Sequence, residues 1–131
     1  MKKYVYVGYG KRIESSVPQK LPNIKKKLSV IITALNEEEN VIPTVNEIKK
    51  NVKNTPFENS YEIIFVEDDS TDKTPEILDK LSKKESLIAL HRYGVKEIFS
   101  ALLDGIEIAN GEYIYTTGAD LSQRLFPDSI L

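Results

Sequence analysis

The sequence predicts an α/β fold with a mostly parallel sheet and helices on both of its faces. Short apolar, β-branched runs alternate along the chain with segments whose apolar residues recur at helical spacing. Such runs are typical of strands buried on both faces, and strand–helix alternation favours right-handed crossovers between parallel strands. The chain has 131 residues, of which 40% are hydrophobic and 29% charged, as expected for one globular domain.

Four strands form the framework of this prediction, at residues 28–34 (LSVIITA), 61–66 (YEIIFV), 87–90 and 113–116. The segment before them, residues 1–27, is interpreted as an N-terminal extension or linker. Within it Tyr4 to Val7 favour a short strand, and a Gly8-Tyr9-Gly10 turn follows. Residues 28–131 are expected to form the principal domain.

The first predicted helix begins after Asn36, which we expect to cap it, with Glu39 as the capping-box partner. Its apolar stripe comprises Val41, Ile42, Val45, Ile48 and Val52.

The second helix begins at Thr74-Pro75-Glu76, which reads as a cap, a proline in the first position and an acid in the first turn. The third helix ends at Asn110-Gly111, two residues that tolerate the left-handed conformation. The apolar face of the second helix comprises Ile77, Leu78 and Leu81, and that of the third comprises Val95, Ile98, Leu102, Ile106 and Ala109.

Composition excludes several kinds of site. Lys and Arg number 18 against 20 Asp and Glu, so the chain lacks the basic excess of a nucleic-acid binder. It has no cysteine and one histidine, His91, so a metal site must be built from oxygen ligands, as suits Mg²⁺ or Mn²⁺. No apolar run approaches the ~18 residues of a membrane span, and we expect a cytoplasmic location.

Polar residues follow three of the predicted strands, at residues 33–37, 67–72 and 118–122. In an open α/β sheet, ligands bind beyond the carboxyl ends of the strands, where helix N-termini favour anions. Carboxylates gathered at this edge suit a cation together with a phosphorylated ligand. The sequence contains neither a P-loop nor a G-x-G-x-x-G fingerprint after the first strand.

Three segments in order, LSVIITALNEEENV, YEIIFVEDDSTDKTPEIL and ALHRYGVKEIFSALLDGIEIANGEYIYTTGADLSQ, resemble successive motifs of the family-2, GT-A-type glycosyltransferases. The likeness is strongest to dolichol-phosphate mannose synthase and related polyprenyl-phosphate sugar synthases, and covers about residues 28–130. It implies a three-layer, Rossmann-like GT-A fold that is truncated after the metal motif.

The resemblance also implies a binding role for particular residues. Residues 33–37 match the segment that contacts base and ribose, and Asp68 matches the acid that hydrogen-bonds the base. Glu67 stands where the family usually has another Asp. The nucleotide-binding residues implied in this way are Thr33, Ala34, Leu35, Asn36, Glu37, Glu67, Asp68 and Ala119.

Other polar residues keep two readings. Arg92 is expected either to approach the diphosphate or to face solvent at the end of its strand. For Ser70-Thr71-Asp72 a turn and cap before the second helix is favoured over ligand contact. His91 is read as a structural histidine rather than a catalytic base, and no catalytic residue is assigned.

The metal motif departs from the family. The usual Asp-x-Asp appears as Gly118-Ala119-Asp120, so Asp120 is left as the metal ligand for Mg²⁺ or Mn²⁺, and we expect a weakened site. The alternative for Asp120 is a turn residue. Glu97 and Phe99 replace small glycines ahead of Ser100, and a carboxylate there would repel a diphosphate.

The function implied is transfer of a sugar, with inversion, from a GDP- or UDP-sugar to an acceptor such as a polyprenyl phosphate. A catalytically inactive nucleotide- or partner-binding module of the same fold is the alternative. A nucleotidyltransferase would want a basic, Gly-rich loop after the first strand, and the sequence has none there. Peripheral contact with a membrane and self-association through an exposed sheet edge are further expectations.

Overall fold

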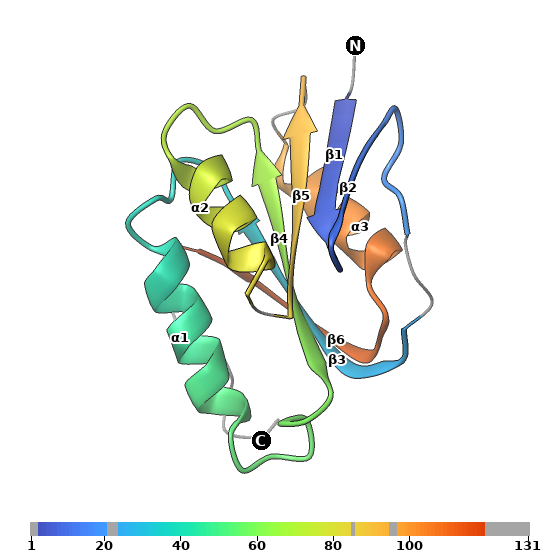
Figure 1. The fold of residues 1–131 in the computed structure, drawn as a ribbon, viewed down its shortest axis with the longest axis vertical. Coiled ribbons are helices and arrows are strands. Elements are labelled where there is room, and N and C mark those ends of the chain that lie inside the picture. The colour runs from blue at the N-terminus through green and yellow to red at the C-terminus, as the bar shows by residue number, and fades with distance from the viewer. Residues whose placement is uncertain (1–2, 21–23, 85, 95–96, 120–131) are drawn as a thin grey trace.

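A mixed six-stranded sheet forms the centre of the molecule (Figure 1). The computed structural model describes residues 3–20, 24–84, 86–94 and 97–119. The strand order is β2-β1-β5-β4-β3-β6, in which the last four strands are parallel neighbours and β1 and β2 are antiparallel. The strands are β1 (Lys3–Gly8), β2 (Lys11–Ser15), β3 (Lys26–Ala34), β4 (Tyr61–Asp68), β5 (Leu87–Tyr93) and β6 (Gly111–Gly118). The predicted mostly parallel α/β fold is confirmed.

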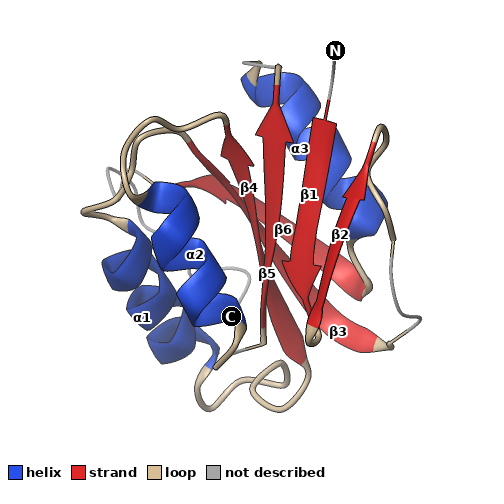
Figure 2. Cartoon of the chain, turned by 45° about the horizontal axis from the view of Figure 1, so that its top comes forward, coloured by secondary structure: helices blue, strands red, loops and turns tan. Residues whose placement is uncertain are grey.

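Helices cover both faces of the sheet, as predicted (Figure 2). Helices α1 (Val41–Val52) and α2 (Thr74–Ser82) lie on one face, and α3 (Ile98–Ile108) lies on the other. Because side chains alternate along a strand, β3 contributes Val30 and Ile32 to the core beneath α1 and α2, and Ile31 to the core beneath α3. The two cores hold the carboxyl ends of β3, β4 and β6 at one edge.

The N-terminal segment contains a hairpin that extends the sheet. Strand β1 lies where Tyr4 to Val7 predicted one, and it pairs with β2 on one side and β5 on the other. Tyr9 and Gly10 join β1 to β2 with φ angles of 51° and 75°, the left-handed values that a two-residue hairpin turn requires. The division at residue 28 stays a prediction.

The predicted capping box at the start of the first helix is wrong. Helix α1 begins at Val41 with Asn40 in the N-cap position, and no side chain caps it. Asn36 instead has a φ of 54°, and its side chain binds another loop. Ile42 of the predicted stripe is 49% exposed, whereas the rest of the stripe is buried.

The predicted apolar face of α3 is confirmed only in part, because Ala109 is buried and Leu102 packs against the core, whereas Val95 lies outside the described residues. Its buried residues are Ala101, Gly105 and Ile108, while Ile98 and Ile106 are 70% and 42% exposed. A Cβ atom on Gly105 would lie 2.5 Å from the Cγ2 atom of Ile31, so the helix packs on the sheet through its smallest residues. Close backbone approach therefore outweighed the larger side chains in setting which face is buried.

The junction between α3 and β6 differs from the prediction as well. Neither Asn110 nor Gly111 has a positive φ. The chain passes directly into β6, and Gly111 is required because a Cβ there would lie 2.4 Å from the backbone nitrogen of Ser29.

The strands run further than their apolar runs indicated. Strand β4 continues through Glu67 and Asp68, and β5 continues through His91 and Arg92. All four side chains are consequently buried in the sheet. No helix in the described part of the chain has the length and apolar character needed to cross a bilayer.

Candidate functional site

A pocket of about 430 Å³ opens at the carboxyl edge of the sheet, where β3, β4 and β6 end and α3 begins. This volume falls in the range of small-molecule sites. Its lining residues are Thr33, Ala34, Leu35, Glu37, Asp68, Ile98, Gly118 and Ala119. Ala119 closes the pocket against β3, since its backbone nitrogen donates a hydrogen bond of 3.2 Å to the carbonyl oxygen of Thr33.

Six of the eight residues predicted to bind a nucleotide therefore line one pocket. The other two, Asn36 and Glu67, do not line it, and their side chains accept hydrogen bonds from the backbone of the loop at residues 70–72. Glu67 is fully buried and accepts a hydrogen bond of 2.6 Å from the backbone nitrogen of Ser70. The roles of all eight residues in binding stay predictions.

Asp68 is the buried carboxylate of the pocket, with 4% of the residue exposed. Burial raises the pKa of Asp68, and this is opposed by the positive charge of Arg92 and by a hydrogen bond with the backbone of Glu97. The hydrogen bond ties the carboxylate to the residue before α3, so Asp68 helps to place the helix start beside the pocket. A carboxylate accepts only, and could accept from an N–H donor of a ligand in the same way.

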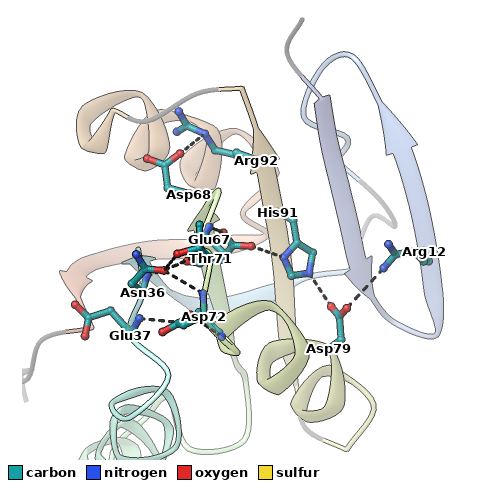
Figure 3. Close-up of polar contacts among 12 residues, drawn as sticks. Arg12, Asn36, Glu37, Glu67, Asp68, Thr71, Asp72, Asp79, His91 and Arg92 are labelled. Atoms are coloured by element: carbon teal, nitrogen blue, oxygen red, sulfur yellow. Dashed lines mark hydrogen bonds and ion pairs between the residues drawn. The ribbon is translucent and has the colours of Figure 1, made fainter.

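Arg92 lies under α3 with no exposed surface, so the solvent-facing alternative is wrong. Its Nε atom is 3.5 Å from Asp68 Oδ1 and its Nη1 atom is 3.6 Å from Asp104 Oδ2, while Nη2 donates to Ser100 Oγ at 2.8 Å (Figure 3 shows the pair with Asp68). Nε and Nη1 have no hydrogen-bond partner. In this conformation the guanidinium balances two carboxylates, and its contact with a diphosphate stays a prediction.

Two loops at the edge are bound to each other by side chains (Figure 3). Asn36 Oδ1 accepts hydrogen bonds from the backbone nitrogens of Thr71 and Asp72, and Asn36 N donates to Ser70 Oγ. Asp72 accepts from Thr74 N at 2.9 Å and from Glu38 N at 3.1 Å. The turn at residues 70–72 is thus confirmed, but the N-cap position of α2 is Lys73 and no side chain caps it, although Asp72 accepts from the first residue of the helix. The segment from Leu35 to Glu37 is fixed by this turn.

Glu67 and Asp68 face opposite sides of the sheet because they are consecutive in a strand. Strand register places His91 opposite Glu67 and Arg92 opposite Asp68. Burial lowers the pKa of His91, but hydrogen bonds with Asp79 and Glu67 and their negative charges outweigh it and raise the pKa to about 9. His91 is buried between two carboxylates, as the favoured reading of a structural histidine expects, and its lack of a role as a catalytic base stays a prediction.

The predicted metal ligand Asp120 lies outside the described residues. Among the residues that the structure describes, no three or more His, Cys, Asp or Glu side chains gather into a metal-binding group. Gly118 and Ala119, which precede Asp120 in the sequence, line the pocket with Asp68. A Cβ atom added to Gly118 would meet nothing within 4 Å, so the position has room for the carboxylate that the usual motif carries.

Sequence reasoning missed three residues that shape this edge. Ile98 lines the pocket although helical periodicity assigned it to the core, and Asp79 and Asp104 bind His91 and Arg92 across elements. Asp79 and Asp104 could have been found from the sequence, because a carboxylate on the sheet-facing side of a helix needs a buried partner.

Comparison with known proteins supplies the family. The family model for glycosyl transferase family 2 matches residues 29–123. A dolichol-phosphate mannosyltransferase of Pyrococcus furiosus is 36% identical over 95 residues, which cover 72% of this chain and 26% of that protein. An undecaprenyl-phosphate 4-deoxy-4-formamido-L-arabinose transferase of Proteus mirabilis is 32% identical over 100 residues, covering 72% and 29%. The chain thus spans little more than a quarter of these relatives.

Solved structures agree with the sequence comparison. Residues 1–349 of S. aureus TarS in complex with UDP superpose with a TM-score of 0.61 at 25% identity, covering 72% of this chain and 27% of that one. The same protein in complex with UDP-GlcNAc gives a TM-score of 0.59 at 26% identity. By its matched residues and its fold, this chain belongs to glycosyl transferase family 2.

Proposed function

We propose that this chain binds the nucleotide of a GDP- or UDP-sugar in the pocket at the carboxyl edge of the sheet. The observation that carries the proposal is the convergence of six predicted nucleotide residues on that one pocket. The UDP and UDP-GlcNAc complexes of TarS support it, because the chain shares its fold with that protein. Asp68 would accept a hydrogen bond from a base N–H, and Leu35 would lie against the base or ribose.

The protein that contains this domain would transfer the sugar to an acceptor such as a polyprenyl phosphate. In that reaction an acceptor oxygen forms a bond to the anomeric carbon as the bond to the diphosphate oxygen breaks, which inverts the configuration. The names of the Pyrococcus and Proteus relatives support a lipid phosphate acceptor. Such an acceptor would bring the protein to a membrane surface.

Mg²⁺ or Mn²⁺ would be held by Asp120 together with diphosphate oxygens, and would balance the charge on the leaving group when bound. Gly118 in place of a carboxylate weakens this site. It also favours the second candidate, a nucleotide- or partner-binding module without catalysis.

Calorimetric titration with UDP, GDP, UDP-GlcNAc and GDP-mannose, each with and without MnCl₂, tests the proposal. We expect one base to bind, more tightly with Mn²⁺, and Asp68→Asn to weaken binding about tenfold, because a neutral amide oxygen accepts a hydrogen bond more weakly than a carboxylate does. Gly118→Leu should also weaken it by filling the pocket, whereas Gly118→Ala should not. Absence of nucleotide binding by folded wild-type protein would refute the proposal.

Gly118→Asp distinguishes the two candidates. It restores the first carboxylate of the usual motif at a position with free space, so we expect tighter Mn²⁺ binding and a larger effect of Mn²⁺ on nucleotide affinity. A transferase should then release nucleoside diphosphate faster in the presence of a polyprenyl phosphate. Nucleotide binding without such release, in wild type and variant alike, would favour the module.

A further inference from the structure

A buried histidine lies next to the proposed site without contacting its pocket. His91 is 1% exposed and sits between two carboxylates (Figure 3). Its Nδ1 atom is 3.0 Å from Glu67 Oε1, on the neighbouring strand, and its Nε2 atom is 2.6 Å from Asp79 Oδ1, on α2. The Glu67 side chain is fully buried, whereas that of Asp79 is 34% exposed.

The two contacts define the charge of the ring. An ionised carboxylate oxygen can only accept a hydrogen bond, so each ring nitrogen must carry a proton to bond to its partner. A neutral imidazole has one N–H and would leave one of the two carboxylates facing a lone pair. His91 is therefore an imidazolium that compensates two negative charges, one of them fully buried.

The groups around His91 belong to four elements. Glu67 comes from β4 and Asp79 from α2, and Arg12 of β2 approaches Asp79 Oδ2 at 3.6 Å. Burial raises the pKa of Tyr93, two residues further along β5, which also lies in the field of Glu67, Asp79, Arg12 and Lys3, whose Nζ atom is 5.6 Å from the centre of its ring. Tyr93 is thus a second group near His91 that titrates at alkaline pH.

Glu67 connects the histidine to the loops of the pocket edge. One carboxylate oxygen faces His91, and the other accepts the backbone N–H of Ser70 at 2.6 Å. Ser70 Oγ in turn accepts from the backbone of Asn36, between the pocket residues Leu35 and Glu37. A continuous path of hydrogen bonds thus runs from α2 through His91 to the pocket wall.

We propose that His91 is a positioning residue: as an imidazolium it fixes the Glu67 carboxylate, which holds the turn at residues 69–72 and through it the pocket segment at residues 35–37. Loss of the ring proton leaves Glu67 as a buried charge without a cation on that side. The carboxylate then turns away from Ser70 or admits water, and the turn loosens. The effect on nucleotide affinity rests on the proposed function, whereas the coupling between His91 and Ser70 does not.

Because His91 is the only histidine, NMR reports its titration without ambiguity. The ring carbon and nitrogen signals and the Ser70 amide signal are followed in wild-type protein from pH 6 to pH 10. We expect both ring nitrogens to be protonated at pH 7, and the Ser70 amide to shift with the same midpoint as the ring. Asp79→Asn removes one negative charge, so it should lower both midpoints together by a unit or more.

Two variants control this experiment. Tyr93→Phe removes the neighbouring phenol and should leave both midpoints unchanged. Glu67→Gln should uncouple the Ser70 amide signal from the ring titration. In this variant the backbone N–H of Ser70 no longer faces a carboxylate whose position depends on the charge of His91. A neutral ring at pH 7, or a Ser70 amide that stays constant through the ring titration, would overturn the proposal, and the wild-type titration alone decides this.

The consequence for binding is measured separately with UDP and GDP. For the nucleotide that binds, affinity should fall several-fold above the His91 midpoint, and in Asp79→Asn the fall should move to lower pH with that midpoint. The shift is the informative quantity, since uracil and guanine themselves ionise at alkaline pH. Affinity that does not follow the midpoint would overturn the link to the pocket. If neither nucleotide binds at any pH, the proposed function fails while the Ser70 result still stands.

Discussion

Replacement of Glu62 should destabilise the protein without affecting the pocket, because this buried carboxylate lies at the opposite end of the sheet. Glu62 has no exposed surface and accepts four hydrogen bonds. Oε1 accepts from Tyr9 Oη at 2.6 Å and Asn110 Nδ2 at 3.2 Å, and Oε2 accepts from Ser29 Oγ at 2.6 Å and Asn110 N at 2.7 Å. The carboxylate thereby joins the N-terminal hairpin, β3 and the start of β6.

The structure gives the size of the effect. Ser29 Oγ accepts a hydrogen bond from Gly111 N at 2.8 Å and donates its single proton to Glu62 Oε2. Glu62→Met leaves this hydroxyl and the Asn110 N–H without acceptors in the core, and each orphaned buried donor costs about 1–3 kcal/mol. We therefore expect a loss of roughly 2–6 kcal/mol for the two donors together. Glu62→Gln should cost less, about 1–2 kcal/mol, since its oxygen can face the Oε2 donors while Tyr9 and the Asn110 side-chain amide reorient toward its NH₂ group.

Urea unfolding followed by circular dichroism measures these losses. Glu112→Gln is the matched control, because Glu112 is exposed on β6, which is separated from β4 by β3, and the change should fall within about 0.5 kcal/mol. Nucleotide affinity of the folded variants should equal that of wild type. Glu62→Met with the stability of Glu112→Gln would refute the account of the four hydrogen bonds.

Two further predictions concern a tight backbone contact and pH. Gly111→Ala should lower the unfolding free energy measured in urea by about 1–3 kcal/mol, because its Cβ would meet the Ser29 backbone at 2.4 Å. Gly118→Ala should be near neutral, because its Cβ would meet nothing within 4 Å. Equal losses in the two variants would contradict this account. The pKa of His91 is raised to about 9 from about 6.5, so its stabilisation is complete below pH 6.5 and is lost as the pH rises through 9, by about 3 kcal/mol in all. The difference in unfolding free energy between wild type and His91→Gln should shrink accordingly between pH 6 and pH 9.5, and a constant difference would show that His91 keeps one charge state.

The sequence was sufficient for the order and type of the principal elements. A strand buried on both faces needs a run of apolar residues, and a helix packed on a sheet needs an apolar stripe. These patterns lie within each segment, so β3, β4, α1 and α2 could be predicted from their own residues. The convergence of Thr33, Asp68 and Ala119 on one pocket also followed, because parallel strands bring their carboxyl ends to the same edge whatever fills the core.

Tertiary packing decided the rest. The face that α3 buries depended on Gly105 meeting Ile31, a contact between distant segments that periodicity does not encode. Strand register placed His91 opposite Glu67 and Arg92 opposite Asp68. The sequence suggested only that these residues stand at strand ends, whereas in the structure they form two buried ion pairs on opposite faces of the sheet. A charged residue is stable in a core only beside its partner, and which residue becomes that partner is set by the pairing of strands and helices rather than by neighbours in sequence.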